Sequence, residues 1–149
     1  MSLKTILSEK GGEVISIDFT ADLSTAAKLL TERRIGVLAV IGVDGRLAGI
    51  LSERDIVRAI AKKGDIIALR LSVAEIMTRN VSTCDVSDSI GSVMERMTEG
   101  RFRHIPVFDE DRLVGLVSIG DLIKYHLDTL REQLRHLGQS MAEFELFRL

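Results

Sequence analysis

Apolar and polar residues follow the same pattern twice along the chain. Within residues 23–30, apolar side chains stand at the spacing i, i+3, i+4, i+7, and the same spacing returns 67 residues later within residues 90–97. Because an α-helix turns once in about 3.6 residues, this spacing places the apolar side chains on one face. Each copy therefore predicts an amphipathic helix that packs on a core.

Two short apolar runs follow each of these helices. In the first copy, residues 37–41 and 47–51 flank the sequence Asp44-Gly45, which is a strong hairpin signal. The second copy repeats the arrangement with residues 105–108 and 113–117, and because it has one turn residue fewer, the offset falls to 66. Each copy thus predicts a helix, a strand, a turn and a strand in that order.

The second strand of each copy ends at the sequence Ser-x-x-Asp. These residues are Ser52 and Asp55 in the first copy, and Ser118 and Asp121 in the second. A serine that caps a helix, followed by an acidic residue in the first turn, is typical of a helix start. We therefore expect a further helix after each hairpin, and a short helical turn at residues 73–78 that leads into the second copy.

The duplication predicts an α/β (α+β) fold in which two repeats pack about a pseudo-twofold axis. A copy of roughly 50 residues is only marginally stable alone, so we expect one shared core. We assign residues 10–69 to the first repeat, 70–127 to the second and 128–149 to a C-terminal helical tail. An axis of this kind creates a cleft with paired sites.

Composition restricts the class of protein. The chain has 46% hydrophobic and 28% charged residues, as ordinary globular domains do. A net charge of −2 and a pI of about 5.9 give no general attraction to nucleic acid or acidic membranes. The single cysteine, Cys84, cannot form an internal disulfide, and no segment is long and apolar enough to cross a bilayer. We expect a protein of the cytoplasm.

Signatures of catalysis are missing from the sequence. It contains no Gly-x-Ser-x-Gly elbow, no His-Glu-x-x-His motif and no Walker loop. His126 and His136 stand ten residues apart without a third ligand at metal-binding spacing. We therefore expect neither an enzyme nor a metal site. An enzyme and a nucleic-acid-binding module that use the same cleft stay open as alternatives.

One family shares this arrangement. The pattern Gly-hydrophobic-x-Ser-x-x-Asp occurs at residues 49–55 and 115–121, with Arg-His-Ile-Pro-Val at 103–107 and Ile-Met-Thr at 76–78. Over residues 10–127 the chain resembles a tandem pair of CBS domains, the cystathionine-β-synthase type of regulatory module. It is most similar to the pair proteins of bacteria and plant organelles that carry no other domain. The resemblance implies a nucleotide-binding role in energy or redox sensing and signal transduction, which acts on an effector that is a separate protein.

The resemblance also implies the ligand and its contacts. An adenosine ligand would lie in the cleft, with Asp55 or Asp121 accepting hydrogen bonds from the ribose and Ser52 or Ser118 facing the phosphates. AMP is favoured, while ADP, ATP, NAD(H) and S-adenosylmethionine stay possible. The residues expected to complete the Asp55 site are Thr78, Val81, Phe102, Arg103, His104 and Ile105. Those expected at the Asp121 site are Val14, Ile15, Ile35, Gly36, Val37 and Leu38.

Basic residues predict that the two sites differ. Arg54 precedes Asp55, and Arg101, Arg103 and His104 stand on the expected partner strand. Several such donors can converge on one phosphate. The second copy has Gly120 in place of Arg54, so we expect phosphate at the Asp55 site and a weaker, less charged pocket at Asp121. The alternatives are that the Ser-x-x-Asp residues are only helix caps, that the arginines are solvated and that His104 is structural.

The tail carries a second repeat of apolar positions. Residues 123, 127, 130, 134, 137, 141 and 144 are apolar at alternating spacings of four and three, which is a heptad seam. The resemblance implies that two modules pair, and we expect the seam to support such a homodimer. The alternatives are that the helix packs on its own domain and that Gly138 bends it.

Overall fold

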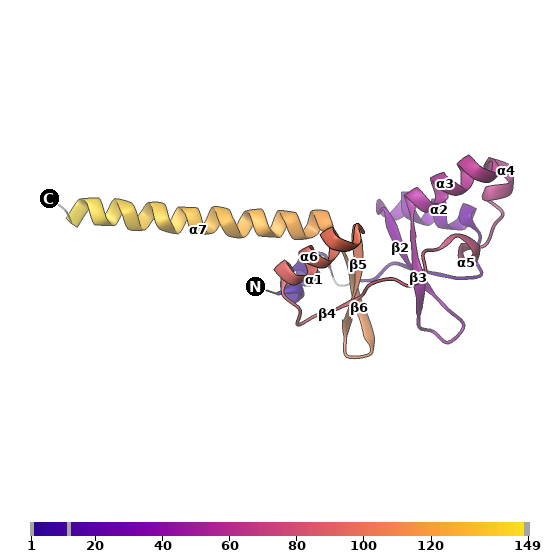
Figure 1. Cartoon of the computed structure of the whole chain (residues 1–149), viewed down its shortest axis with the longest axis horizontal. Helices are drawn as coiled ribbons and strands as arrows, with labels where there is room; N and C mark the ends of the chain where they lie inside the picture. Colours follow the sequence, from indigo (N-terminus) through magenta and orange to yellow (C-terminus); the bar gives the residue numbers. More distant parts are fainter. Residues whose placement is uncertain (1, 12, 148–149) are drawn as a thin grey trace.

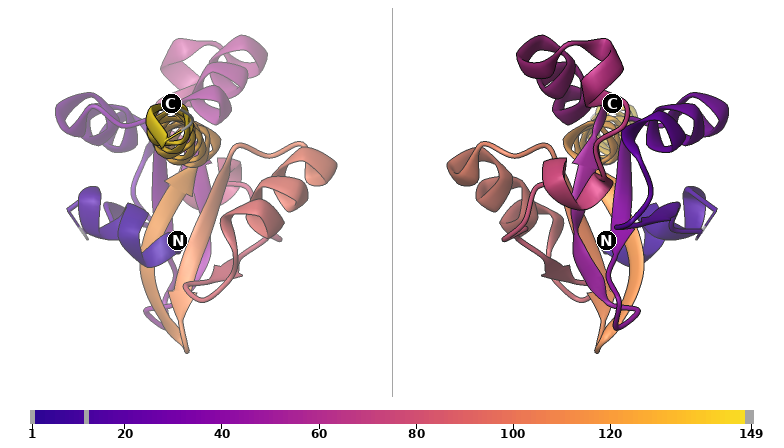
Figure 2. Two further views of the ribbon diagram at one scale, coloured as in Figure 1. Left: turned by 90° about the vertical axis from the view of Figure 1, so that its left-hand side faces the viewer. Right: turned by 90° about the vertical axis from the view of Figure 1, so that its right-hand side faces the viewer.

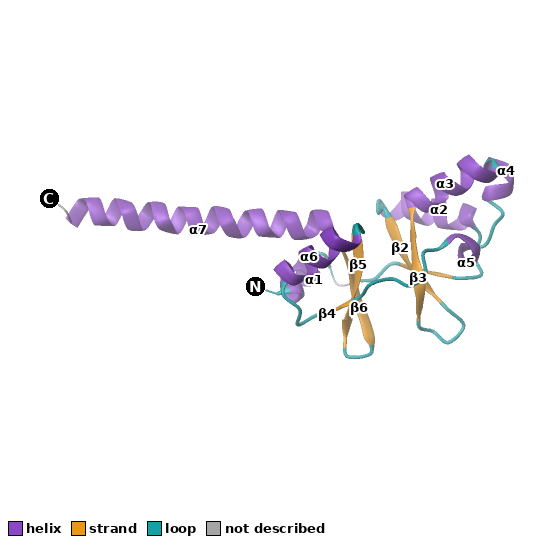
Figure 3. Ribbon diagram, in the orientation of Figure 1, coloured by secondary structure: helices purple, strands orange, loops and turns teal. Residues whose placement is uncertain are grey.

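The computed structural model describes the backbone of residues 2–11 and 13–147 and the side chains as far as residue 141. It contains two similar halves, each with a three-stranded sheet, and a long C-terminal helix that projects from the body (Figure 1). Figure 3 shows the strands of the two halves as two separate groups, each with its own helices. The predicted fold class is confirmed.

The first half contains a sheet in the order β1-β2-β3. Strand β2 pairs in parallel with β1 and antiparallel with β3, so that Val37 lies opposite Ser52. The elements are β1 (Ser16–Asp18), α2 (Leu23–Arg33), β2 (Val37–Ile41), β3 (Leu47–Ser52) and α3 (Glu53–Lys63). The predicted helix, hairpin and second helix are all present, whereas the three-residue strand β1 was not predicted.

The second half repeats this arrangement in a sheet of order β4-β5-β6. Its antiparallel hairpin places His104 opposite Ser118. The elements are β4 (Cys84–Asp85), α6 (Ile90–Gly100), β5 (His104–Asp109), β6 (Arg112–Ser118) and α7 (Ile119–Phe147). Strand β4, like β1, is too short to show an alternating pattern and was not predicted.

The segment that precedes each half packs on the other half. Helix α1 (Leu3–Glu9) places Leu3 and Ile6 in the core of the second half. After the short helix α4 (Asp65–Ala68), helix α5 (Val73–Ile76) places Val73 in the core of the first half. We call residues 2–11 and 72–78 the lead-in segments. Figure 2 shows the strands of both halves at the centre, with α7 seen end-on at their upper ends and the other helices outside.

The second lead-in segment is joined to the first half through its main chain. Ile50 and Thr78 exchange two N–H···O bonds of 3.1 and 2.8 Å. Gly49 lies directly against this bridge, because a Cβ atom placed on it would collide with the carbonyl oxygen of Thr78. At the equivalent position of the second half, Gly115 faces the side chain of Leu7 instead. The glycine of the first motif thus contacts main-chain atoms, whereas the glycine of the second contacts a side chain.

Helix α7 is continuous over 29 residues, or about 43 Å, and passes Gly138 without interruption. Leu122 at its start is fully buried, whereas the seam side chains farther along are exposed. The helix therefore packs on its own domain only at its beginning. Phe144, the last predicted seam position, lies outside the residues whose side chains are described. Within the described part of the chain, no helix combines the length and hydropathy of a membrane span.

The two motif glycines provide a matched pair of substitutions. Gly49→Ala should lower the free energy of unfolding by about 1–3 kcal/mol, because the new methyl group meets main-chain atoms that are fixed by the bridge to Ile50. Gly115→Ala should cost less, because the Leu7 side chain can rotate away. Urea unfolding of both variants measures the difference. Equal losses would show that the bridge does not fix the lead-in segment.

Candidate functional site

The serine and aspartate of both motifs form the same capping box. Asp55 Oδ2 accepts the Ser52 N–H at 2.9 Å, and Ser52 Oγ accepts the Asp55 N–H at 3.2 Å. In the second half, the corresponding bonds between Ser118 and Asp121 are 2.8 and 3.1 Å. The capping role is therefore real in both halves. It uses Oδ2 of each aspartate, so that Oδ1 stays outside the box and is the oxygen that can accept from a ligand.

Each motif lies beside the first residues of the neighbouring strand in its own hairpin. The Glu53 N–H donates to the Gly36 carbonyl at 2.9 Å, and the Ile119 N–H donates to the Arg103 carbonyl at 2.8 Å. An antiparallel hairpin always places the start of one strand beside the end of the next. Arg103 and His104 consequently lie next to Ser118, the serine of their own repeat.

A cavity of about 550 Å³ lies between the two halves at the second motif. Its volume falls in the range of about 300–1,000 Å³ that is usual for small-molecule sites. Both halves and the first lead-in segment contribute to its wall. The lining residues are Leu7, Lys10, Gly11, Glu13, Val14, Ile15, Arg33, Ile35, Gly36, Val37, His104, Val114, Gly115, Leu116 and Ser118.

Lys10 is bound to the aspartate of this motif. Its Nζ atom donates to Asp121 Oδ2 at 2.7 Å and to the Leu116 carbonyl at 3.0 Å. The side chains of Lys10 and Asp121 are 42% and 27% exposed, so the ion pair is only partly screened by water. With Arg33 and His104 also in the wall, three basic side chains lie at the Asp121 end of the cleft.

The pKa values of two groups reflect this environment. Burial acts to raise the pKa of Asp121, but hydrogen bonds from Lys10 and Ser118 and the Lys10 charge outweigh it, so that the pKa is lowered. Because the folded state holds this carboxyl below its ordinary value, the stabilisation exists above that value and is lost as pH falls through the folded pKa. Burial, together with the charges of Lys10 and Arg103, lowers the pKa of His104. His104 is therefore neutral at pH 7.

His104 lies near both motifs. We expected Arg103 and His104 to complete the Asp55 site; hairpin register places His104 opposite Ser118, and His104 lines the cavity at the second motif, while the charge of Glu53 in the first motif also acts on it. The assignment of Arg103 and His104 to the Asp55 site, and the lower charge of the pocket at Asp121, therefore stay predictions. Arg54 does not line this cavity and instead borders a shallow pocket on α3, with Glu53, Val57 and Arg58.

The remaining predicted residues divide into lining and core. Val14, Ile15, Ile35, Gly36 and Val37 line the cavity with Ser118, as expected for the Asp121 site.

Four others have structural surroundings. The side chains of Leu38 and Ile105 are fully buried in the two cores, and Phe102 packs against the second core. Thr78 is held by its bridge to Ile50. Val81 lies half-buried in the loop before β4.

Sequence reasoning missed Lys10 and did not place Arg33 in the site. Lys10 is the C-cap residue of α1, a helix that was not predicted, and Arg33 is the last residue of α2. Neither position belongs to a recognisable motif. The only signal was that both are basic residues near a boundary of an element, which is common on any protein surface.

A second cavity, of about 980 Å³, lies beside the hairpin turns and has the opposite charge. Carboxylates dominate its polar lining, with Asp85, Asp88, Glu110 and Asp111 against one arginine, Arg46. Such a lining disfavours phosphate.

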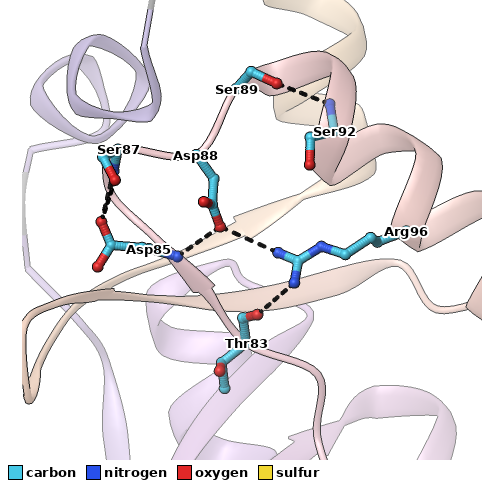
Figure 4. A network of polar contacts seen from close by, with 7 residues as sticks. All are labelled: Thr83, Asp85, Ser87, Asp88, Ser89, Ser92 and Arg96. Carbon is cyan, nitrogen blue, oxygen red and sulfur yellow. Dashed lines mark hydrogen bonds and ion pairs between the residues drawn. The ribbon is translucent and has the colours of Figure 1, made fainter.

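Figure 4 shows how part of this lining is held. Asp88 accepts the Asp85 N–H at 2.9 Å and contacts Arg96 at 3.4 Å, while Arg96 also donates to the Thr83 carbonyl at 3.0 Å. The carboxylates of Asp88 and of Asp85, which accepts from Ser87, therefore have structural partners.

The thiol of Cys84 and the metal-ligating residue types have the following surroundings. Cys84 is buried, and burial raises the pKa of its thiol to about 11, so it stays protonated and unreactive at pH 7. No group of three or more His, Cys, Asp or Glu residues that could hold a metal ion occurs within the described part of the chain.

Comparison with known proteins agrees with this architecture. The family model described as "CBS domain" matches residues 6–62 and 73–128. The chain spans 34–63% of the length of the first three curated relatives that it matches.

Solved structures provide the remaining comparisons. A CBS-domain containing protein from Agrobacterium tumefaciens is 40% identical, with a TM-score of 0.78 over 83% of this chain and 91% of that one. A CBS domain protein from Pyrobaculum aerophilum complexed with AMP is 27% identical, with a TM-score of 0.72 over 81% and 89% of the two chains. A CBS domain pair in complex with 5′-methylthioadenosine and S-adenosyl-L-methionine is 28% identical, with a TM-score of 0.75 over 87% and 98%. Two matched segments, two like halves and two motifs together establish that the chain belongs to the CBS domain family, as a tandem pair.

Proposed function

We propose that this protein is a regulatory module that binds an adenosine nucleotide in the cavity beside Ser118 and Asp121. The observation that carries this proposal is a cavity of about 550 Å³ whose wall contains three basic side chains and Ser118, with the Asp121 carboxylate bonded to two of its lining residues, Lys10 and Ser118. A ribose offers hydroxyl donors to a carboxylate, and a phosphate offers acceptors to basic groups. One nucleotide therefore satisfies both kinds of group at once.

The roles of the residues follow from their positions. Asp121 accepts from the ribose through Oδ1, which its capping box leaves out. Lys10 and Arg33 provide positive charge for the phosphate, and the neutral His104 provides a hydrogen-bonding ring nitrogen. Val14, Ile15 and Val37 provide the apolar wall on which the adenine packs.

The known relatives support an adenosine ligand. One solved relative contains AMP, and another contains 5′-methylthioadenosine and S-adenosyl-L-methionine. AMP is our preferred ligand for this chain, because the cavity contains basic groups that can bind its phosphate as well as a carboxylate that can bind its ribose. The module then reports the nucleotide level to an effector.

The cleft has a second, weaker half-site at Asp55. Its capping box matches that of Asp121, and Thr78 and Val81 lie in the segment that leads from the first half to the second. No ion pair to Asp55 occurs among the described residues. This half-site suits an adenosine moiety without a terminal phosphate.

We also propose that two copies of this chain pair through α7. Six seam side chains lie on one stripe with 42–67% of their surface exposed, namely Ile123, Leu127, Leu130, Leu134, Leu137 and Met141. Burying one such side chain fully stabilises by about 1.5–3 kcal/mol. A second α7 is the occupant that fits, because a heptad seam is complementary to another helix with the same repeat.

The nucleotide site is tested with a matched pair of aspartate variants. Asp121→Asn should weaken AMP binding by roughly 10- to 100-fold, because a charge-assisted hydrogen bond to the ribose is replaced by a neutral one. Asp55→Asn changes the same group in the other half and should leave the tighter site nearly unaffected. Isothermal titration calorimetry measures both. A larger loss of AMP affinity in Asp55→Asn than in Asp121→Asn would show that the nucleotide binds in the other half of the cleft.

The dimer is tested on the exposed part of α7. The double variant Leu134→Glu/Leu137→Glu should shift the mass measured by light scattering from dimer to monomer, since four like charges would face one another in the pair. Gln139→Glu, on the same helix but off the seam, is the control and should stay dimeric. A wild-type protein that is monomeric at high concentration, or a double variant that remains dimeric, contradicts pairing through α7.

A further inference from the structure

Lys10 holds the carboxylate that the proposed site needs for the ribose. Its ammonium group lies 2.7 Å from Asp121 Oδ2 and 3.0 Å from the Leu116 carbonyl, so both acceptors are already occupied in this structure. Helix α1 anchors the base of the lysine side chain, because Leu3, Ile6 and Leu7 are buried in the second core. Only the long stem of Lys10 is free to move.

The first half of the molecule shows what this place looks like without a lysine. There the carbonyl of Ile50, the counterpart of Leu116, accepts the main-chain N–H of Thr78 at 2.8 Å. A fixed, neutral donor thus stands in the first half where a movable cation stands in the second. The described residues place no cation on Asp55, although its capping box matches that of Asp121.

A ligand whose ribose donates to Asp121 Oδ1 lies beside Lys10, which occupies Oδ2. A neutral nucleoside offers the ammonium group no charged partner, so it gains nothing from Lys10. A nucleotide offers a phosphate in the same cavity, and an ammonium group on a flexible stem can transfer to it. The ammonium group then adds a charge-assisted bond that only a phosphorylated ligand receives.

We propose that Lys10 is the residue that makes this cavity select phosphorylated adenosine ligands over neutral ones such as adenosine and 5′-methylthioadenosine. This inference rests on the proposed function, since it concerns the selectivity of that same site. It assigns the choice of ligand to a residue outside the repeated motif. Arg33 adds charge to the cavity but holds neither acceptor, so its effect is on affinity for anions in general.

The test compares AMP and adenosine, which differ by one phosphate, on three proteins. In the wild type, AMP should bind more tightly than adenosine. Lys10→Gln should bind AMP less tightly and adenosine about as tightly as the wild type, so that the ratio of the two affinities falls by about tenfold or more. Lys62→Gln removes the same charge from an exposed position on α3 and should leave the ratio unchanged. An unchanged ratio in Lys10→Gln, with AMP still bound, overturns the selectivity role alone.

A second measurement judges the ion pair without any ligand. An NMR titration of the Asp121 carboxyl should show a higher pKa in Lys10→Gln than in the wild type, because the variant removes the cation and its hydrogen bond. An equal pKa in both proteins overturns the contact on which the inference stands. If neither AMP nor adenosine binds the wild type, the proposed function and the selectivity role both fail, whatever the titration shows.

Discussion

The exchange of lead-in segments is the packing arrangement on which the rest of the molecule depends. Helix α1 completes the core of the second half with Leu3 and Ile6, while Val73 and Met77 complete the core of the first. Halves of roughly 50 residues bury too little surface to be stable alone, so each needs the segment that precedes the other. The cleft between them is consequently held at a fixed geometry, because neither half can move without uncovering part of both cores.

The same exchange explains why two nearly identical motifs form unlike sites. Each motif has the same capping box, yet the lead-in segments end in different chemistry at the two places. Thr78 presents a main-chain N–H to Ile50, whereas Lys10 presents an ammonium group to Leu116 and Asp121. With Arg33 in the same cavity as Lys10, two positive charges lie at one end of the cleft, beside the neutral ring of His104. The duplication accounts for the two like halves and their matching motifs, and the segments outside these motifs make the two sites different.

Much of the fold could be predicted from the sequence because its signals are local. The spacing of apolar residues located α2 and α6, the Asp44-Gly45 turn located the first hairpin, and the Ser-x-x-Asp sequences located the starts of α3 and α7. Strands β1 and β4 were not predicted, because strands of three and two residues are too short to show an alternating pattern of apolar and polar residues. The grouping of His104 with Asp55 stays a prediction, because hairpin register places His104 opposite Ser118 of its own repeat but does not decide which motif shares a ligand with it.

By itself, the sequence determined the local elements, the duplication and the heptad seam of α7, since capping, turn formation and helical periodicity depend on residues only a few positions apart. Only the tertiary structure decided which residues share the cavity. Lys10 and Asp121 are 111 positions apart, and no sequence pattern near either residue indicates that the two are in contact. They meet because the apolar face of α1 is buried against the second half, and the position of the lysine follows from packing that no short stretch of sequence encodes.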